Sequence, residues 1–137
     1  MDYLENIHYD DTIPFVPPIT SGKVVKIYDG DTITIASKLP NTTGPIYRFQ
    51  VRMNGIDTPE IKGKNAAEKK MAEKARDALT QKIFGKIVRL QNVSTEKYGR
   101  ILADVYLDHL NLSQWMLDNK YAVEYNGGTK IRPDDWN

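Results

Sequence analysis

A single long amphipathic helix, set among short strand-like segments, is the feature that most constrains the fold of this chain. Apolar residues repeat at intervals of four through residues 67–83, with charged residues between them. The repeating positions are Ala67, Met71, Ala75, Leu79 and Ile83. This spacing places one apolar stripe along a helix, and Gly85 is suited to end it.

β-Branched and aromatic residues concentrate in five short segments, three before the helix and two after it. These segments are residues 23–28, 32–35, 46–53, 87–90 and 101–107. The turn at residues 29–31 predicts a hairpin, because Gly30 accepts a left-handed backbone and Asp hydrogen-bonds nearby amides. We expect irregular chain at 55–65 and a polar loop at 92–99. This order predicts an α+β protein whose core is a five-stranded OB-fold β-barrel with two or three helices.

The ends of the chain differ from its centre. Residues 1–20 contain three prolines and four acidic residues but no Lys or Arg, so we expect residues 1–21 to form a disordered acidic arm. Asn111 is placed to cap a short second helix over residues 112–118, and residues 121–125 should be extended. The sequence thus predicts one OB-fold domain over residues 22–130, followed by a tail at 131–137.

Composition excludes several classes of protein. The 137 residues contain no cysteine and only two histidines, which rules out thiolate zinc sites, iron–sulfur clusters and thiol nucleophiles. No apolar run approaches the roughly 20 residues of a membrane span, so we expect no membrane partner. The first residues lack the basic and apolar regions of a signal peptide. We therefore expect the protein in the cytoplasm of its own cell or inside a host cell. We also expect a monomer.

The net charge of +1 hides an uneven distribution. Residues 62–89 contain nine basic and three acidic residues. Such a basic stretch suits a protein that binds a polyanion, although Lys-rich surface helices also occur in proteins that bind none. Charge alone leaves both interpretations open.

Acidic residues in two neighbouring loops suggest a cation site. Asp31 ends the hairpin turn, while Asp57 and Glu60 share one short loop. Asp31 by itself is typical of a turn, and the run from Asp57 to Glu60 could equally be a helix-start signature. If both loops converge, two carboxylates could hold a hard divalent cation, and a third could deprotonate a water.

Two arginines complete the set of groups that phosphoryl transfer needs. Arg52 lies in the third strand, where alternation puts it on the same face as Gln50, and Arg100 opens the last strand. Each could be a solvated arginine at a strand end. Together with the carboxylates they match the charge that builds on a reacting phosphate, because guanidinium forks pair with its oxygens.

Three short blocks resemble the signature blocks of the staphylococcal nuclease (thermonuclease-like) family. They are residues 28–32 (YDGDT), 51–60 (VR, four residues, DTPE) and 97–100 (KYGR). Their order and approximate spacing hold over residues 22–125, most of the chain. The resemblance implies an OB-fold, calcium-dependent phosphodiesterase that cuts DNA and RNA and leaves 3′-phosphate ends.

The resemblance also implies roles for the acidic loops. Asp31 and Asp57 correspond to calcium ligands, and Thr58 to a residue that supplies a backbone carbonyl ligand. Glu60 corresponds to the base that activates the attacking water.

The remaining implied roles concern the substrate. Arg52 and Arg100 correspond to residues that clamp the scissile phosphate, and Lys97 and Tyr98 to residues that contact a neighbouring phosphate. A tyrosine that lines the nucleotide pocket corresponds to Tyr125, with Tyr121 as the alternative. The chain departs from the family's founding member in its proline-rich arm, and we expect no counterpart of that member's longer C-terminal helix.

Other functions fit the sequence less well. A non-catalytic OB-fold module that binds nucleic acid remains the alternative, although the acidic and arginine positions of the enzyme are all present. The E-x-K pattern at residues 60–62 is typical of another class of metal nuclease, but Pro59 disfavours the strand that this class requires. A calcium-sensor loop starting at Asp29 fails, because Ile33 and Thr34 stand where a polar ligand and a glycine are needed.

Overall fold

Five strands close into a barrel. The computed structural model describes residues 3–60, 65–96 and 99–125. The five strands are β1 (Ser21–Asp29), β2 (Thr32–Ser37), β3 (Tyr47–Met53), β5 (Ile87–Thr95) and β6 (Ile101–Leu107). Neighbours in the order β3-β2-β1-β5-β6 are antiparallel, and a parallel pairing of β3 with β6, from Val51 opposite Ile101, completes the circle. The five-stranded OB-fold barrel expected from the sequence is confirmed.

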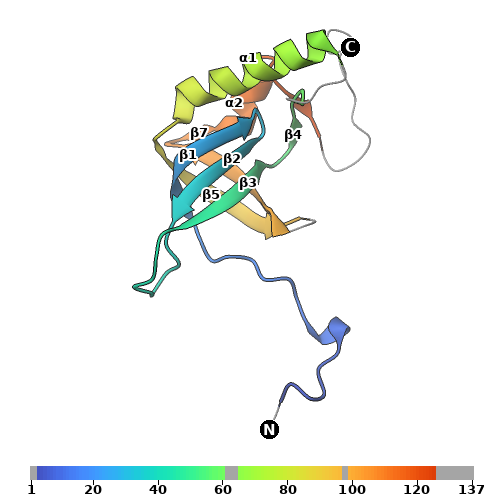
Figure 1. Ribbon diagram of the computed structural model, residues 1–137, viewed down its shortest axis with the longest axis vertical. Coiled ribbons are helices and arrows are strands. Elements are labelled where there is room, and N and C mark those ends of the chain that lie inside the picture. The colour runs from blue at the N-terminus through green and yellow to red at the C-terminus, as the bar shows by residue number, and fades with distance from the viewer. Residues whose placement is uncertain (1–2, 61–64, 97–98, 126–137) are drawn as a thin grey trace.

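Helix α1 (Ala66–Ile83) lies across one end of this barrel (Figure 1). Its first turn is capped by Asn65, whose side chain accepts a hydrogen bond from the backbone N–H of Glu68 at 2.8 Å. The helix ends at Ile83 with Phe84 as its C-cap, and Gly85 follows with φ +80°, the left-handed conformation typical of a helix terminus. The helix starts well after residues 57–60, so the interpretation of that run as a helix-start signature is wrong.

Short elements complete the described chain. Helix α2 (Leu112–Asp118) has the expected cap, because the side chain of Asn111 accepts from the N–H of Gln114. Strand β7 (Leu110–Asn111) pairs with the end of β6, and a 3₁₀ turn, η1 (Tyr9–Asp11), lies in the N-terminal arm.

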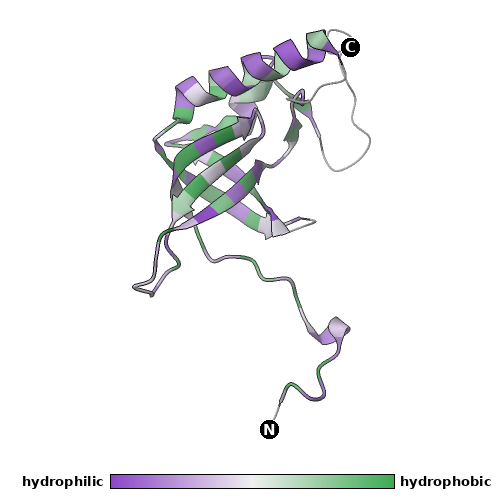
Figure 2. Ribbon diagram, viewed as in Figure 1, coloured by the Kyte–Doolittle hydropathy of each residue, from purple (hydrophilic) through white to green (hydrophobic). Residues whose placement is uncertain are grey.

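Side chains from alternate positions of the strands fill the barrel. Figure 2 shows hydrophobic and hydrophilic residues alternating along the strands, as strands with one face in the core require. Ile33, Val51 and Ala103 are fully buried, and Leu79 of α1 and Met116 of α2 cover the end of the barrel.

The buried stripe of α1 differs from the expected one in its first turns. Glu68 and Ala72 are buried there, whereas Ala67 is exposed and Met71 is half-buried. A strict four-residue repeat drifts around a helix of 3.6 residues per turn, so a stripe that stays on one face must include a three-residue step. The step falls between Ala72 and Ala75.

Two expectations about loops are wrong. Strand β5 continues to Thr95 instead of giving way to a loop at residue 92. Asn92 adopts a left-handed backbone with φ +53° at an irregularity in the β5–β6 register, and pairing resumes at Ser94. The segment at 55–65, expected to be irregular, contains β4 (Ile56–Asp57), which pairs with β8 (Val123–Glu124).

The N-terminal arm leaves the barrel at the end opposite α1 (Figure 1). Side chains of residues 3–16 are exposed, whereas Ile19 is only 4% exposed and belongs to the core. Disorder of the arm and the boundaries proposed for the domain stay predictions, and the tail at 131–137 lies outside the described residues. No helix in the described ranges is long and apolar enough to cross a membrane.

Candidate functional site

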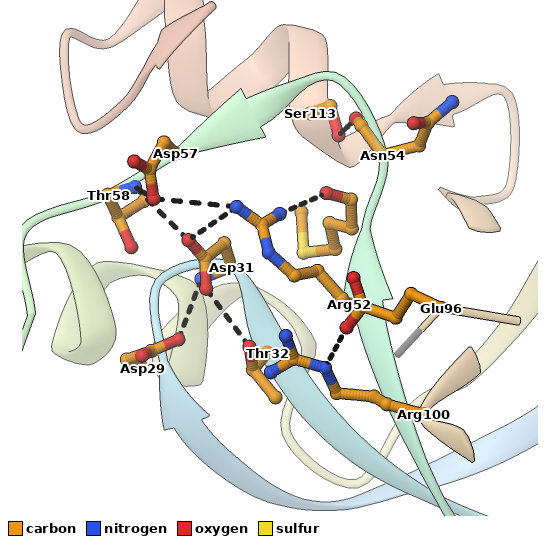
Figure 3. A network of polar contacts seen from close by, with 11 residues as sticks. Asp29, Asp31, Thr32, Arg52, Asn54, Asp57, Thr58, Glu96, Arg100 and Ser113 are labelled. Atoms are coloured by element: carbon orange, nitrogen blue, oxygen red, sulfur yellow. Dashed lines mark hydrogen bonds and ion pairs between the residues drawn. The ribbon is translucent and has the colours of Figure 1, made fainter. Parts of the chain in front are cut away.

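Six of the side chains predicted for the site line one cavity at the rim of the barrel. The cavity has a volume of about 250 Å³. Its lining includes Asp31, Arg52, Asp57, Thr58, Glu60 and Arg100, together with Tyr28, Asp29 and Thr32. The turn between β1 and β2, the end of β3, the β4 segment and the start of β6 therefore meet at one place (Figure 3). Lys97 and Tyr98 lie outside the described residues.

Two carboxylates converge at the floor of this cavity. The N–H of Thr58 donates to Asp31 Oδ2 and to Asp57 Oδ1, each at 3.1 Å. Asp31 is 5% exposed and Asp57 is 8% exposed. Two buried carboxylates this close repel each other unless positive charge lies beside them.

Arg52 supplies that charge. Its Nη2 lies 3.5 Å from Asp31 Oδ2 and 3.4 Å from Asp57 Oδ1, while Nη1 donates to the carbonyl of Met53 at 2.9 Å. Tyr125 lies with its ring 5.5 Å from the guanidinium carbon of Arg52, in cation–π distance. The arginine is therefore fixed by contacts on three sides.

The β4–β8 pairing brings Tyr125 to this place. Asp57 is opposite Val123, and the N–H of Tyr125 donates to the carbonyl of Gly55 at 2.9 Å. Tyr121, the alternative for the nucleotide-pocket role, instead packs against Trp115 with ring centroids 5.9 Å apart. Of the two tyrosines, Tyr125 is the one in contact with a site residue.

Asp29 also belongs to the site, although sequence reasoning assigned it only to a turn. Its side chain accepts a hydrogen bond from the N–H of Asp31 at 3.2 Å. Burial and the proximity of Asp31 raise the pKa of Asp29 to about 8. Burial also acts to raise the pKa of Asp31, but hydrogen bonding from Asp29 and the charge of Arg52 outweigh it and leave that pKa below its ordinary value. The signal in the sequence was a second aspartate two residues before the predicted ligand.

The turn itself is tight for a reason other than the one expected. Gly30 does not adopt a left-handed backbone. A Cβ atom at this position would lie 2.9 Å from the Thr58 methyl group and 3.1 Å from both Ala75 Cβ and Met116 Cε. Glycine is required here because the turn packs against the site loop and both helices.

Arg100 and Glu60 form the remaining walls. Arg100 lines the cavity, and its Nε donates to the carboxylate of Glu96 in an ion pair (Figure 3). The backbone N–H of Glu96 donates to the carbonyl of Arg100, which ties the two residues together. Glu60 is exposed at the mouth of the cavity, where a carboxylate can reach solvent water.

The donor set suits a hard cation. Two carboxylate oxygens face one another, and Thr58 Oγ1 is buried with no hydrogen-bond partner within the described chain. Calcium and magnesium both prefer such oxygen ligands. No three His, Cys, Asp or Glu residues are grouped for metal binding in residues 3–60, 65–96 and 99–125, so carbonyl groups and water would have to complete the coordination.

Comparison with known proteins identifies the family. The family model for staphylococcal nuclease homologues matches residues 50–135, more than half of the chain. The chain belongs to the staphylococcal nuclease family. Two of its three signature blocks, at residues 51–60 and 97–100, fall inside the matched region.

Several relatives of this staphylococcal nuclease homologue carry nuclease names. A probable staphylococcal-like nuclease of Oryza sativa subsp. japonica is 32% identical over 87 residues, which cover 64% of this chain and 21% of the relative. An uncharacterized endonuclease of Haemophilus influenzae is 33% identical over 103 residues, covering 75% and 51% of the two chains. One of Escherichia coli is 30% identical over 97 residues, covering 70% and 55%. The chain thus spans between about a fifth and a half of the length of these relatives.

Proposed function

We propose that this protein is a calcium-dependent endonuclease. It hydrolyses phosphodiester bonds in DNA and RNA with little sequence preference, acts as a monomer and leaves 3′-phosphate ends. The observation that carries the proposal is the meeting of Asp31, Arg52, Asp57, Glu60 and Arg100 at one cavity. Family membership supports the general class of nuclease.

In this proposal each side chain has a task that its chemistry allows. Asp31 and Asp57 would hold the cation, which supplies positive charge beside a phosphate oxygen. Arg52 and Arg100 donate hydrogen bonds to the non-bridging oxygens, where negative charge grows as the water oxygen approaches phosphorus. Asp29 holds the N–H of Asp31 and keeps that carboxylate in place.

Glu60 acts as the general base. It takes a proton from a water that attacks phosphorus in line with the leaving oxygen. The bond from phosphorus to O5′ breaks, and O5′ takes a proton from solvent water and becomes the free 5′-hydroxyl. The phosphate therefore stays on O3′ of the preceding nucleotide and forms a 3′-phosphate end.

Cleavage of a fluorescent single-stranded DNA, and of the matching RNA, tests this proposal. Each is incubated with calcium, with magnesium or with a chelator. We expect cleavage with calcium only, and a loss of roughly 10²- to 10⁴-fold in kcat for Glu60→Gln, because a positioned general base contributes about that much. Glu73→Gln is the matched control, since Glu73 is exposed on α1 and does not line the cavity.

The alternative is an OB-fold module that binds nucleic acid without cutting it. Salt-sensitive binding without cleavage under any metal would favour that alternative. Cleavage that Glu60→Gln leaves intact would instead remove Glu60 from the mechanism. End-group analysis of the products decides the position of the phosphate.

A further inference from the structure

A second cavity adjoins the candidate active site. It has a volume of about 450 Å³ and is called the flanking cavity below. Its walls come from the end of the arm, from β3 and from the start of β6. The lining residues are Pro17, Arg48, Phe49, Gln50, Gly99, Arg100 and Ile101. Arg100 lines both cavities, so the flanking cavity continues directly from the place where the phosphate would be cut.

The register of the barrel explains why this space exists. Strand β3 begins at Tyr47, but its parallel pairing with β6 starts only at Val51, opposite Ile101. Residues 48–50 therefore pair with β2 on one side and have no β6 partner on the other within the described chain. The flanking cavity occupies this opening between the two strands.

Polar side chains follow one face of β3 from the flanking cavity into the active site. Alternate residues of a strand point to the same side and lie about 6.8 Å apart, so Arg48, Gln50 and Arg52 form a row. Arg52 contacts the metal-site carboxylates, which places Arg48 two steps away along the same row.

The charge of the flanking cavity suits a phosphate. Its described lining contains two arginines and a glutamine amide but no acidic side chain. Arg48 is exposed and makes no ion pair with any residue of the described ranges, so its guanidinium is available to a ligand. Phe49, which is half-buried, adds apolar surface that a sugar or a base could cover.

We propose that the flanking cavity binds the nucleotide next to the scissile phosphate, with Arg48 in contact with the phosphate of that nucleotide. The inference rests on the proposed nuclease function and extends it: the substrate is a single strand that runs along β3, and its contacts reach one nucleotide beyond the bond that is cut. Extension of a minimal substrate on one side only should therefore improve cleavage.

A series of short substrates tests this directly. The first is a dinucleotide with one cleavable phosphodiester, and two others carry one extra nucleotide on the 5′ or the 3′ side. For the wild-type protein we expect one extension to raise kcat/KM by roughly tenfold, as a charge-assisted phosphate contact would, mainly through KM. In Arg48→Gln the ratio of kcat/KM for that extended substrate to kcat/KM for the dinucleotide should fall close to one. Arg48→Lys should keep part of the gain from extension.

A matched control separates this contact from general loss of positive charge. Arg89 lies on β5, where its guanidinium carbon is 5.2 Å from the ring centroid of Tyr106, and it lines neither cavity. Arg89→Gln should therefore keep the wild-type ratio. The slope of log KM against log salt should become shallower by about one for Arg48→Gln on the extended substrate, but not for the control.

Each outcome decides between the two proposals. An equal gain from extension in wild type and Arg48→Gln overturns the flanking cavity while the nuclease function stands. Absence of any gain from extension in the wild type also overturns the flanking-cavity proposal while the nuclease function stands. If the wild type cuts nothing, the nuclease function fails, and fluorescence anisotropy with the same oligonucleotides then tests the cavity. If the longer oligonucleotide binds more tightly and Arg48→Gln loses this gain, the flanking-cavity proposal is supported. Equal affinities for the short and the longer oligonucleotide overturn it. Circular dichroism checks that each variant is folded.

Discussion

The contact of Arg52 with two buried carboxylates makes the stability of the metal-free protein sensitive to one substitution. The Arg52 side chain is 11% exposed, and those of Asp31 and Asp57 are 8% and 11% exposed. Arg52→Met keeps the apolar length of the side chain but leaves both carboxylates without their counter-charge. Removal of one partner from a buried ion pair costs about 3–5 kcal/mol. For 137 residues, with an unfolding entropy of about 2.1 cal/mol/K per residue, this corresponds to a decrease in Tm of roughly 10–17 °C.

The cost should depend on pH in a defined direction. The pKa of Asp31 in the folded protein lies below its ordinary value, in part because of Arg52. A depressed pKa contributes stability that is present above the unfolded pKa of about 3.9 and is lost as pH falls through the folded pKa. The difference between wild type and Arg52→Met should therefore be largest at neutral pH and shrink below about pH 4.

Urea unfolding followed by circular dichroism, in the presence of a chelator, measures these differences between pH 3.5 and 7.5. Arg76→Met is the matched control, because Arg76 pairs with Asp77 on the surface, where the two side chains are 33% and 66% exposed. Such exposed pairs contribute about 0–1 kcal/mol. Equal losses of unfolding free energy for Arg52→Met and Arg76→Met at pH 7 would refute the argument that Arg52 is the counter-charge of two buried carboxylates. Calcium should also stabilise Arg52→Met more than wild type, because a bound cation can replace the missing charge.

Two further perturbations follow from burial. Asp29→Asn should stabilise the metal-free protein, because burial and Asp31 raise the pKa of Asp29 to about 8 and ionisation therefore disfavours the fold. The gain in the free energy of unfolding should grow from about pH 4 to pH 8 and vanish in acid. Urea unfolding midpoints measured against pH test this. Removal of residues 1–16 should change the free energy of unfolding little, since the side chains of residues 3–16 are exposed, whereas Ile19→Ala should cost about 2–5 kcal/mol. Similar losses for the truncation and Ile19→Ala would contradict that division of the arm.

Local periodicity was enough to predict the barrel and both main helices. Alternation in β2 and β3 fixes which side chains point inward, and the asparagine before α2 marks its start. The segment at 121–125 was expected to be extended, and β8 lies in it. Its partner, the two-residue strand β4, could not be predicted, because two residues carry no period. Their pairing is non-local and brings together residues almost 70 positions apart in the chain. The position of Tyr125 over Arg52 depends on it.

The flanking cavity was beyond prediction for a related reason. Alternation along β3 places Arg48, Gln50 and Arg52 on one face, and this much follows from the sequence. Whether Arg48 lies against a neighbouring strand or beside an opening depends on where β6 begins to pair with β3. That register is set by the closure of the whole barrel, and no residue near Arg48 records it.

Gly30 shows how the core and the site depend on each other. Turn propensity predicts glycine at this position for its left-handed backbone, and on that argument Asn or Asp would serve nearly as well. The structure gives a steric reason instead, because the first atom of any side chain would meet the Thr58 methyl group and side chains from both helices. The turn that carries Asp31 is thus held between the site loop and the packing of α1 and α2. A residue that touches no ligand determines how closely Asp31 approaches the N–H of Thr58, and with it the convergence of the two carboxylates.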